Sequence, residues 1–294
     1  MTTATSDGSD SLTAHRVESV VPRAPTADAS TRGFGHATTA RRVALDRFVA
    51  DVDDSWRVLR GPNGGYLAAL LLQTMTTRLD DAARRPRVLS LHYPGVPHEG
   101  QVEIRTELTR TGRTMSWIAG ELWQDEKLCV AARSAFSGEW PSIEIERRAP
   151  PAAPPLESGI EMRQSMPPFG QHFDYRSLYA TPAGSNGSDA VGGYIRPRVP
   201  QPYGPALIAA MADAWFPSTV AFERRPVMAA TIDLTVHFRD YAALGSLAPT
   251  DFVHTIFRTR LATEGFFEED GELWTRDGRL IAQSRQLAVA TPYG

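Results

Sequence analysis

The sequence repeats itself, and this repeat constrains the fold more than any other feature. The tetrapeptide GELW occurs at Gly120–Trp123 and again at Gly271–Trp274. Around it, VEIRTELTRTGRTMSWIAGELW aligns without a gap on VHTIFRTRLATEGFFEEDGELW, 151 residues later. The segments QDEKLCVAARSAF and TRDGRLIAQSRQLA follow, with one extra residue in the turn. Alternating or β-branched residues around Asp-containing turns are typical of antiparallel hairpins. The repeat therefore predicts two similar sheets.

A segment with the composition of a buried helix precedes each predicted sheet. PNGGYLAALLLQTM and PYGPALIAAMADAW align at a spacing of 140 residues and share a proline, a glycine, a leucine and an alanine. Both are largely apolar, which is typical of a helix buried on every side. Each half then contains a short strand, a long helix and about four antiparallel strands, and the curved sheet wraps around the helix. The predicted fold class is α+β, with two tandem units whose sheets meet edge to edge: a double hotdog.

Composition suggests the domain boundaries. Residues 1–33 are rich in Ser, Thr, Ala, Asp and Pro with little periodicity, which predicts a disordered N-terminal tail. Residues 147–165 begin with RRAPPAAPPLESG, whose prolines fit neither a helix interior nor a central strand, so we expect a linker there. The first hotdog unit is then expected at residues 34–146 and the second at residues 166–294.

Charge and cysteine content argue against several classes of protein. The chain has 31 basic and 34 acidic residues, a net charge of −3 and no long basic run, so neither nucleic acid nor a membrane is an expected partner. Cys129 is the only cysteine, which excludes an intramolecular disulfide and a cysteine-cluster metal site. GxSxG and HExxH patterns are absent, and we expect no metal and no cofactor. No signal-like segment opens the chain, so the cytoplasm is the default location. The sequence leaves open whether the chain forms a homo-oligomer.

Five motifs occur in an order known from one enzyme family: GGYLAALLLQ, TRTGRTMSW with LWQDEKL, MADAWFP, ATIDLTVHF and DGRLIAQSRQLAV. In these motifs the chain, from about residue 35 to residue 292, resembles the hotdog thioesterases, and most of all acyl-CoA thioesterase II and its relatives. The resemblance implies hydrolysis of acyl-CoA thioesters to free acid and coenzyme A, within fatty acid metabolism. It also implies a water-activating trio, which by motif is Asp213, Thr231 and Gln286.

The residues themselves support a carboxylate base. Asp213 is the one carboxylate in the otherwise apolar PALIAAMADAWF, and a buried carboxylate is unfavourable unless it has a partner or a use. Gln73 holds the aligned place in the first half and cannot accept a proton, so one half has a base and the other does not. A threonine hydroxyl and a glutamine amide can orient a water beside a carboxylate. The alternative is a structural Asp213, hydrogen-bonded to neighbouring backbone near a helix end.

Gly64 and Gly65 open the first predicted helix. Glycine destabilises a helix, so the presence of two glycines there needs another explanation. A helix start has free backbone N–H groups, and glycine allows close approach to them. Thioester hydrolysis places negative charge on the carbonyl oxygen, and in hotdog pairs the carboxylate of one unit faces the helix start of the other. We therefore expect Gly64 and Gly65 to donate to the acyl carbonyl and Tyr66 to line the acyl channel. Arg113, in the TRTGRT turn, is a candidate contact for coenzyme A phosphates, with a solvated turn as the alternative.

Two other functions stay open at this point. A double-hotdog enoyl-thioester hydratase or dehydratase needs a His–Asp pair, for which His92 or His237 against Asp213 are the candidates. A non-catalytic acyl-CoA-binding protein would bind the same ligand without turnover. We also expect Asp233, two residues past Thr231, to share its strand face and to add a second polar group. The sequence does not specify the acyl chain length, nor whether coenzyme A or a carrier protein holds the acyl group.

Overall fold

The computed structural model describes residues 33–145, 150–185, 187–223 and 227–292. The predicted tail therefore lies outside the described residues except for its last residue, as does the start of the predicted linker. The rest of that linker forms two short 3-10 helices, η3 (Leu156–Ser158) and η4 (Arg163–Ser165), around the two-residue strand β7 (Ile160–Glu161). Because β7 is the last strand of the sheet, the prolines before it stay outside the central strands.

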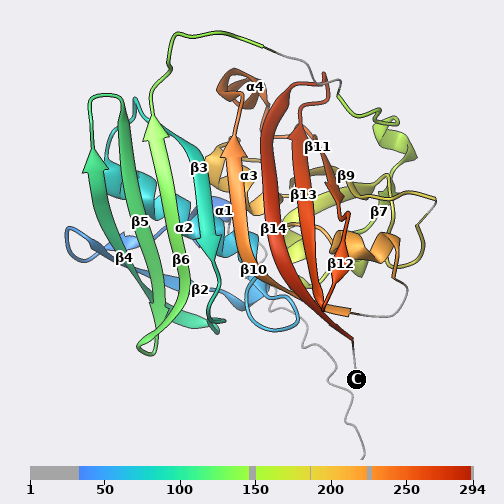
Figure 1. Cartoon of the computed structure of the whole chain (residues 1–294), viewed down its shortest axis with the longest axis horizontal. Helices are drawn as coiled ribbons and strands as arrows, with labels where there is room; N and C mark the ends of the chain where they lie inside the picture. Colours follow the sequence, from blue (N-terminus) through green and yellow to red (C-terminus); the bar gives the residue numbers. More distant parts are fainter. Residues whose placement is uncertain (1–32, 146–149, 186, 224–226, 293–294) are drawn as a thin grey trace, which may run out of the picture.

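The strands of the described residues form one large antiparallel sheet (Figure 1). In the first half its strands are β1 (Arg41–Arg42), β2 (Arg47–Val52), β3 (Arg85–His92), β4 (Gly100–Thr111), β5 (Met115–Gln124) and β6 (Lys127–Ser137). In the second half they are β7, β8 (Phe173–Ser177), β9 (Val191–Pro197), β10 (Val227–Phe238), β11 (Val253–Arg258), β12 (Ala262–Thr263), β13 (Phe266–Trp274) and β14 (Leu280–Pro292). The helices are α1 (Phe34–Ala37), α2 (Gly64–Leu79), α3 (Pro205–Met211) and α4 (Tyr241–Ser246).

The strand order shows the repeat directly. The order of neighbouring strands is β2-β4-β5-β6-β3 in the first unit and, read toward the centre of the sheet, β9-β11-β13-β14-β10 in the second unit. The two units meet where β3 pairs antiparallel with β10, with Leu91 opposite Leu234. The sheets of the two units are thus joined edge to edge, as the repeat predicts. The hairpins aligned in the sequence are β4-β5-β6 and β11-β13-β14.

The two central helices differ in length. Asn63 caps α2, because its side-chain oxygen accepts a hydrogen bond from the Tyr66 N–H, and the helix continues for 16 residues. Helix α3 has only 7 residues and ends at Met211, whereas the sequence predicts a helix that continues past Asp213. Asp213 consequently lies in the turn after α3. Pro217 follows shortly, and proline bars a helix from continuing through it.

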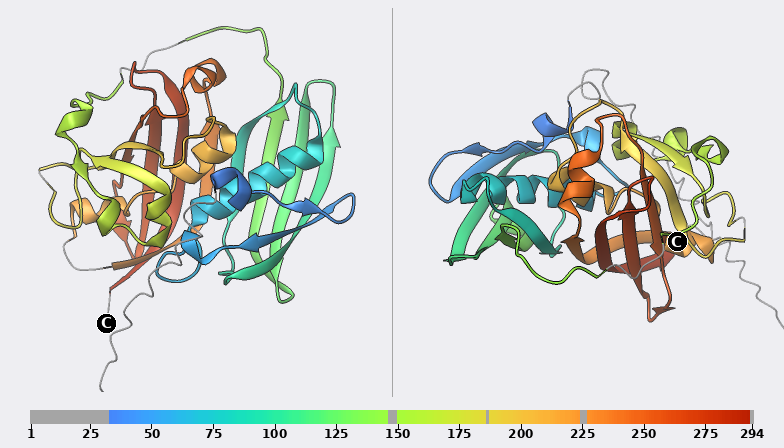
Figure 2. Two further views of the ribbon diagram at one scale, coloured as in Figure 1. Left: turned by 180° about the vertical axis from the view of Figure 1, so that it is seen from behind. Right: turned by 90° about the horizontal axis from the view of Figure 1, so that it is seen from above.

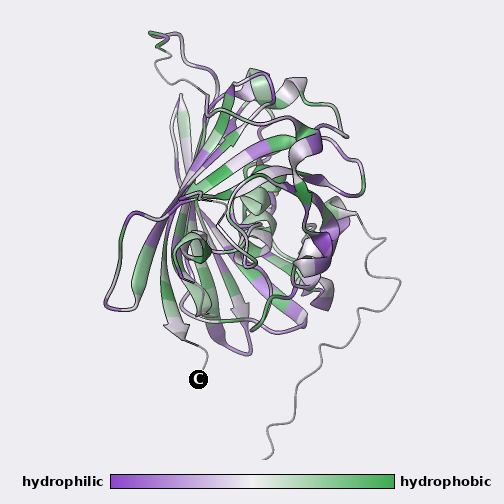
Figure 3. Cartoon of the chain, turned by 90° about the vertical axis from the view of Figure 1, so that its right-hand side faces the viewer, coloured by the Kyte–Doolittle hydropathy of each residue, from purple (hydrophilic) through white to green (hydrophobic). Residues whose placement is uncertain are grey.

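Helices α2 and α3 lie on the same, concave side of the sheet (Figure 2). One hydrophobic core spans both units, and α2 is buried at every position from Gly65 to Leu72. Buried and more exposed positions alternate along β5, and Figure 3 shows changes of hydropathy along the ribbons. Among the described residues, no helix is both long enough and apolar enough to cross a membrane.

Candidate active site

The start of α2 packs directly against the turn that follows α3. A Cβ atom added to Gly65 would lie 2.6 Å from the Ala210 carbonyl oxygen and 3.0 Å from the Asp213 Cβ. A Cβ atom on Gly64 would lie 2.9 Å from the Asp213 carboxylate. Backbone oxygens cannot give way as a flexible side chain can, so only glycine permits this approach. The two glycines therefore bring the helix start of one unit against the carboxylate of the other.

Three hydrogen bonds hold Asp213 at the start of α2. The Gly65 N–H donates to the Asp213 Oδ2 atom at 2.8 Å, and the Asn63 Nδ2 group donates to the same oxygen at 3.2 Å. Asn63 also donates to the Asp213 backbone carbonyl at 2.8 Å. The carboxylate thus faces the helix start of the other unit, as expected. The Gly65 N–H, however, is engaged by Asp213 itself, whereas the sequence prediction assigns it to the acyl carbonyl.

The surroundings of Asp213 raise its pKa to about 7, mainly because burial disfavours the charged form. The hydrogen bond from Gly65 opposes this effect, the negative charge of Glu269 adds to it, and the hydrogen bond from Asn63 opposes it. A carboxyl group with a pKa near neutrality is well matched to accept a proton at neutral pH. Asp213 is therefore both partnered and chemically suited to act as a base.

Thr231 and Gln286 belong to a second hydrogen-bonded group. The Thr231 hydroxyl donates to the Gln286 Oε1 atom at 2.9 Å, and the Gln286 Nε2 group donates to Glu269 at 2.7 Å. The other Glu269 oxygen accepts from the Ser218 N–H at 2.6 Å. An ionised carboxylate only accepts, so Glu269 fixes which end of the Gln286 amide faces Thr231. The Thr231 proton is then committed to Gln286, and its lone pairs are free to accept a hydrogen bond.

A β-bulge in β10 decides which way Thr231 points. The register between β10 and β14 shifts between Thr231 and Asp233, so Thr231 pairs with Ala288 and Asp233 pairs with Leu287. Cross-strand partners project to the same side of a sheet. Ala288 is buried and Leu287 is exposed, so Thr231 projects inward and Asp233 outward. The expectation that Asp233 shares the face of Thr231 is wrong, because the bulge inserts one residue between them.

Among the described residues, Asp213 makes no direct hydrogen bond to Thr231 or Gln286, and two other side chains connect the groups. The charge of Glu269 acts on Asp213, as its effect on the Asp213 pKa shows. Tyr93 follows β3; its N–H donates to the carbonyl of Ile232, beside Thr231, and its phenol donates to the Gly64 carbonyl. Thr231 and Gln286 are thus linked to the start of α2 through Glu269 and Tyr93, and their joint action with Asp213 stays a prediction.

The sequence analysis does not identify Glu269 and Tyr93 as members of the site. A signal for Glu269 exists: in FFEEDGELW, alternation places it on the same face as the buried Phe267 and Leu273. Burial raises the pKa of Glu269, and its hydrogen bonds to Ser218 and Gln286 lower it. Tyr93 has no such signal, because it lies just past a strand end, where periodicity stops. The contact between Asn63 and Asp213 likewise spans 150 residues, and no local pattern reveals it.

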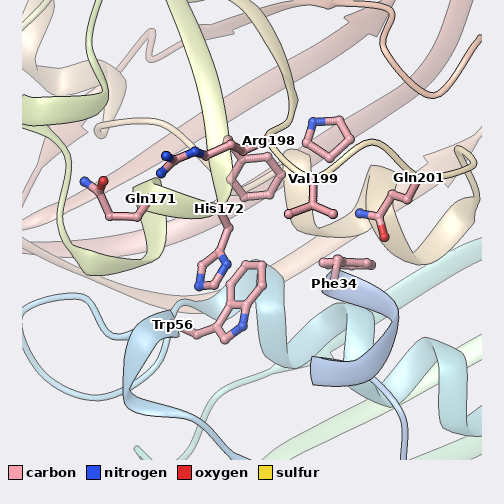
Figure 4. Close-up of a pocket in the computed structure, with 9 residues that line it drawn as sticks. Phe34, Trp56, Gln171, His172, Arg198, Val199 and Gln201 are labelled. Atoms are coloured by element: carbon pink, nitrogen blue, oxygen red, sulfur yellow. The ribbon is translucent and has the colours of Figure 1, made fainter. Parts of the chain in front are cut away.

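Tyr66 lies inside an aromatic stack. Its ring stacks on Trp56 at 4.8 Å between centroids, and Trp56 stacks on His172 at 3.9 Å. The Tyr66 phenol donates to the Ala37 carbonyl. Beyond the stack, Phe34, Trp56, His172 and six neighbours line a cavity of about 10 Å³ (Figure 4), which is room for about one water molecule. The role of Tyr66 in an acyl channel stays a prediction, since this cavity is too small for an acyl chain.

Arg113 lies away from Asp213. Arg84 donates to the backbone carbonyls of Gly112 and Arg113, and Arg84 pairs with Asp81, just past the end of α2. A helix of 16 residues is about 24 Å long, so this turn is at the opposite end of α2 from the site. A contact between Arg113 and a coenzyme A bound at Asp213 is therefore not supported by the structure.

The two histidines proposed for a hydratase are exposed. His92 and His237 lie on β3 and β10 with their side chains on the outer face, whereas Asp213 lies on the inner side. The structure therefore does not form the His–Asp pair that the alternative requires. Among the described residues, no group of three or more His, Cys, Asp or Glu side chains is placed to hold a metal ion.

Comparisons with known proteins agree with this architecture. Residues 52–137 match the family model of the acyl-CoA thioesterase N-terminal domain, and residues 146–290 match that of the acyl-CoA thioesterase C-terminal domain. An uncharacterized protein of Mycobacterium tuberculosis is 25% identical over an alignment of 272 residues that covers 82% of this chain and 90% of that protein.

Two solved structures share the fold. One is a conserved protein of unknown function with a hot dog fold from Alicyclobacillus acidocaldarius, with a TM-score of 0.83 and 22% identity over 89% of this chain and 98% of that chain. The other is a putative thioesterase II from Thermobifida fusca, with a TM-score of 0.75 and 25% identity over 88% of this chain and 97% of that chain. The double hotdog fold is thereby confirmed. The two family models cover more than half of the chain, and the chain therefore belongs to the acyl-CoA thioesterase family, enzymes that hydrolyse acyl-CoA thioesters.

Proposed function

We propose that this enzyme hydrolyses acyl-CoA thioesters with Asp213 as the general base. The observation that carries the proposal is the position of the Asp213 carboxylate, held at the start of α2 with a pKa of about 7. In the reaction, a water gives a proton to Asp213 while its oxygen attacks the thioester carbonyl carbon. The C–S bond then breaks, Asp213 returns this proton to the sulfur, which leaves as the thiol of coenzyme A, and the acyl group leaves as the free acid.

Thr231 and Gln286 orient the attacking water in this proposal. Because the Thr231 proton is donated to Gln286, the threonine oxygen accepts the second hydrogen of the water. Gln286 is in turn held by Glu269, so the direction of each hydrogen bond in the chain is set by a buried carboxylate. Glu269 and Gln286 are positioning residues, whereas Thr231 and Asp213 contact the water.

The start of α2 also supplies the expected donor to the thioester oxygen. Charge develops on that oxygen as water adds, and a backbone N–H at a helix start stabilises it. Since the Gly65 N–H is held by Asp213, we assign this role to the Gly64 N–H. Tyr93, whose phenol donates to the Gly64 carbonyl, would fix the orientation of the next peptide, Gly64–Gly65, whose N–H holds Asp213.

We extend the proposal to a role in fatty acid metabolism, because acyl-CoA esters are its intermediates, and to a cytoplasmic location. The test is release of free thiol from acyl-CoA esters of short, medium and long chains by the purified protein. A matched set of enoyl-CoA esters is followed for loss of the conjugated double bond. A rate of thiol release that increases with the concentration of enzyme supports the proposal. Loss of the double bond without thiol release would instead support a hydratase, and binding without either change would support a non-catalytic protein.

A further inference from the structure

A larger cavity lies at the other end of the paired helices, away from Asp213. Its volume is about 580 Å³, within the range of small-molecule sites. The second half of α2, the start of β3, and the starts of α3 and α4 surround it. The residues that matter for the argument are Leu72, Gln73, Pro205, Ala206, Tyr241 and Leu244.

This cavity is the counterpart of the active site in the repeat. Helices α2 and α3 run antiparallel, since Gly65 contacts Ala210 while Gln73 lies beside Pro205 at the far end of the pair. Asp213 faces the start of α2, and Gln73, which aligns with Asp213 in the sequence, faces the start of α3. The fold thus builds the same cross-helix arrangement twice.

The chemistry of the second arrangement differs at two points. Gln73 cannot accept a proton at the place where Asp213 can. Pro205 aligns with Gly65 and has no N–H, so the donor that holds the Asp213 carboxylate has no equivalent. A thioester bound in this cavity therefore meets no base and would not be hydrolysed there.

The lining nevertheless suits an acyl thioester of an anionic carrier. Leu72, Ala206 and Leu244 form an apolar wall. Arg84 and Arg85 lie at the rim, and the exposed Arg113 is in the turn that Arg84 contacts. Asp81, which also lines the cavity, is paired with Arg84 at 3.0 Å, and Asp80 adds one opposing charge. Arg85 stays 43% exposed, stacks over the Tyr241 ring and pairs with the exposed Glu139 at 3.5 Å, so a phosphate would replace Glu139 in a surface ion pair.

We propose that this cavity is a second, non-hydrolytic binding site for acyl-CoA, so that one chain binds two acyl-CoA molecules and hydrolyses one. The inference rests on the proposed function, because it assigns to the second cavity the substrate class of the first. Gln73 would contact the acyl carbonyl through its amide. Arg85 and Arg113 would contact the phosphates of coenzyme A, because the guanidinium of Arg84 is already engaged by Asp81 and by backbone carbonyls.

The test is the binding stoichiometry of ketone analogues of acyl-CoA, in which a methylene separates sulfur from the carbonyl carbon and prevents hydrolysis. Short-, medium- and long-chain analogues are titrated calorimetrically against the full chain and against Gln73→Trp, which fills the cavity from an exposed helix position. Thr77→Trp is the matched control, since Thr77 is exposed on the same helix outside the cavity. Thermal melting checks the fold of each variant.

We expect two equivalents per chain for the parent and for Thr77→Trp, and one for Gln73→Trp. Hydrolysis by Gln73→Trp at low substrate should stay within about 2-fold of the parent, because the active site is untouched. One equivalent in the parent, or two in Gln73→Trp, overturns the second site. Thiol release measured in parallel separates the two proposals: hydrolysis with a single equivalent refutes only the second site, whereas no hydrolysis of any acyl-CoA refutes the proposed function itself.

Discussion

Replacing the proposed base should make the protein more stable while it removes activity. The pKa of Asp213 rises from its ordinary 3.8 to about 7 in the folded chain. A carboxyl group whose pKa is raised by folding contributes most to stability below its unfolded pKa, and that contribution is lost as the pH rises through 7. Asp213→Asn has no such dependence, because the amide stays neutral and can still accept the hydrogen bond from Gly65.

The size of the effect follows from the two pKa values. Each pKa unit is worth about 1.4 kcal/mol, so ionised Asp213 destabilises the folded state by about 4 kcal/mol at alkaline pH. The residue is partly exposed, and an amide accepts a weaker hydrogen bond than a carboxylate, so we expect a net gain of about 2 kcal/mol. For a chain of this size that gain raises Tm by about 3 °C.

The assay is thermal melting of the parent and Asp213→Asn at about pH 5 and about pH 9. The Tm advantage of the variant should be larger at the higher pH. Asp233→Asn is the control, since the bulge turns Asp233 to the outer face of the sheet and no comparable gain is expected. A variant that melts below the parent at about pH 9, or a Tm difference that does not change with pH, would refute the reasoning.

Two further predictions concern the contacts around the base. Gly65→Ala should destabilise the protein by about 1–3 kcal/mol and reduce turnover, because its Cβ would lie 2.6 Å from the Ala210 carbonyl oxygen. Gly204→Ala, where a Cβ meets nothing within 4 Å, is the control, and equal losses in both variants would contradict the close-approach argument. Glu269→Gln should reduce kcat by about 10-fold or more, with KM little changed, because the direction of the hydrogen bonds through Gln286 to Thr231 is no longer fixed. Steady-state kinetics on the folded variant decide this, and an unchanged kcat would show that Glu269 does not position the water.

The fold was accessible to sequence analysis because its main features are local or repeated. The hairpin alignment places β4-β5-β6 and β11-β13-β14 correctly, and the apolar segments identify α2 and α3. Helix propensity does not reveal where α3 ends, since the turn from Ala212 to Phe216 is composed of residues that a helix also accepts.

The site was predicted less completely, for physical reasons. A carboxylate in an apolar segment identifies Asp213, but the role of Gly65 depends on a contact across 148 residues, which no local pattern encodes. The bulge that separates Thr231 from Asp233 breaks the strand period on which the facing argument depends. Arg113 was assigned from its charge alone, and charge does not determine at which end of α2 its turn lies.

The central claim is that Asp213 takes a proton from water, and the pH dependence of kcat/KM tests it most directly. For the parent, kcat/KM on an acyl-CoA ester should rise with pH and level off above about 7, because the base must be ionised. For Asp213→Asn it should be lower by about 10²–10⁴-fold and lose that rise. A folded Asp213→Asn protein that keeps turnover within a few-fold of the parent, with the same pH profile, would contradict the account.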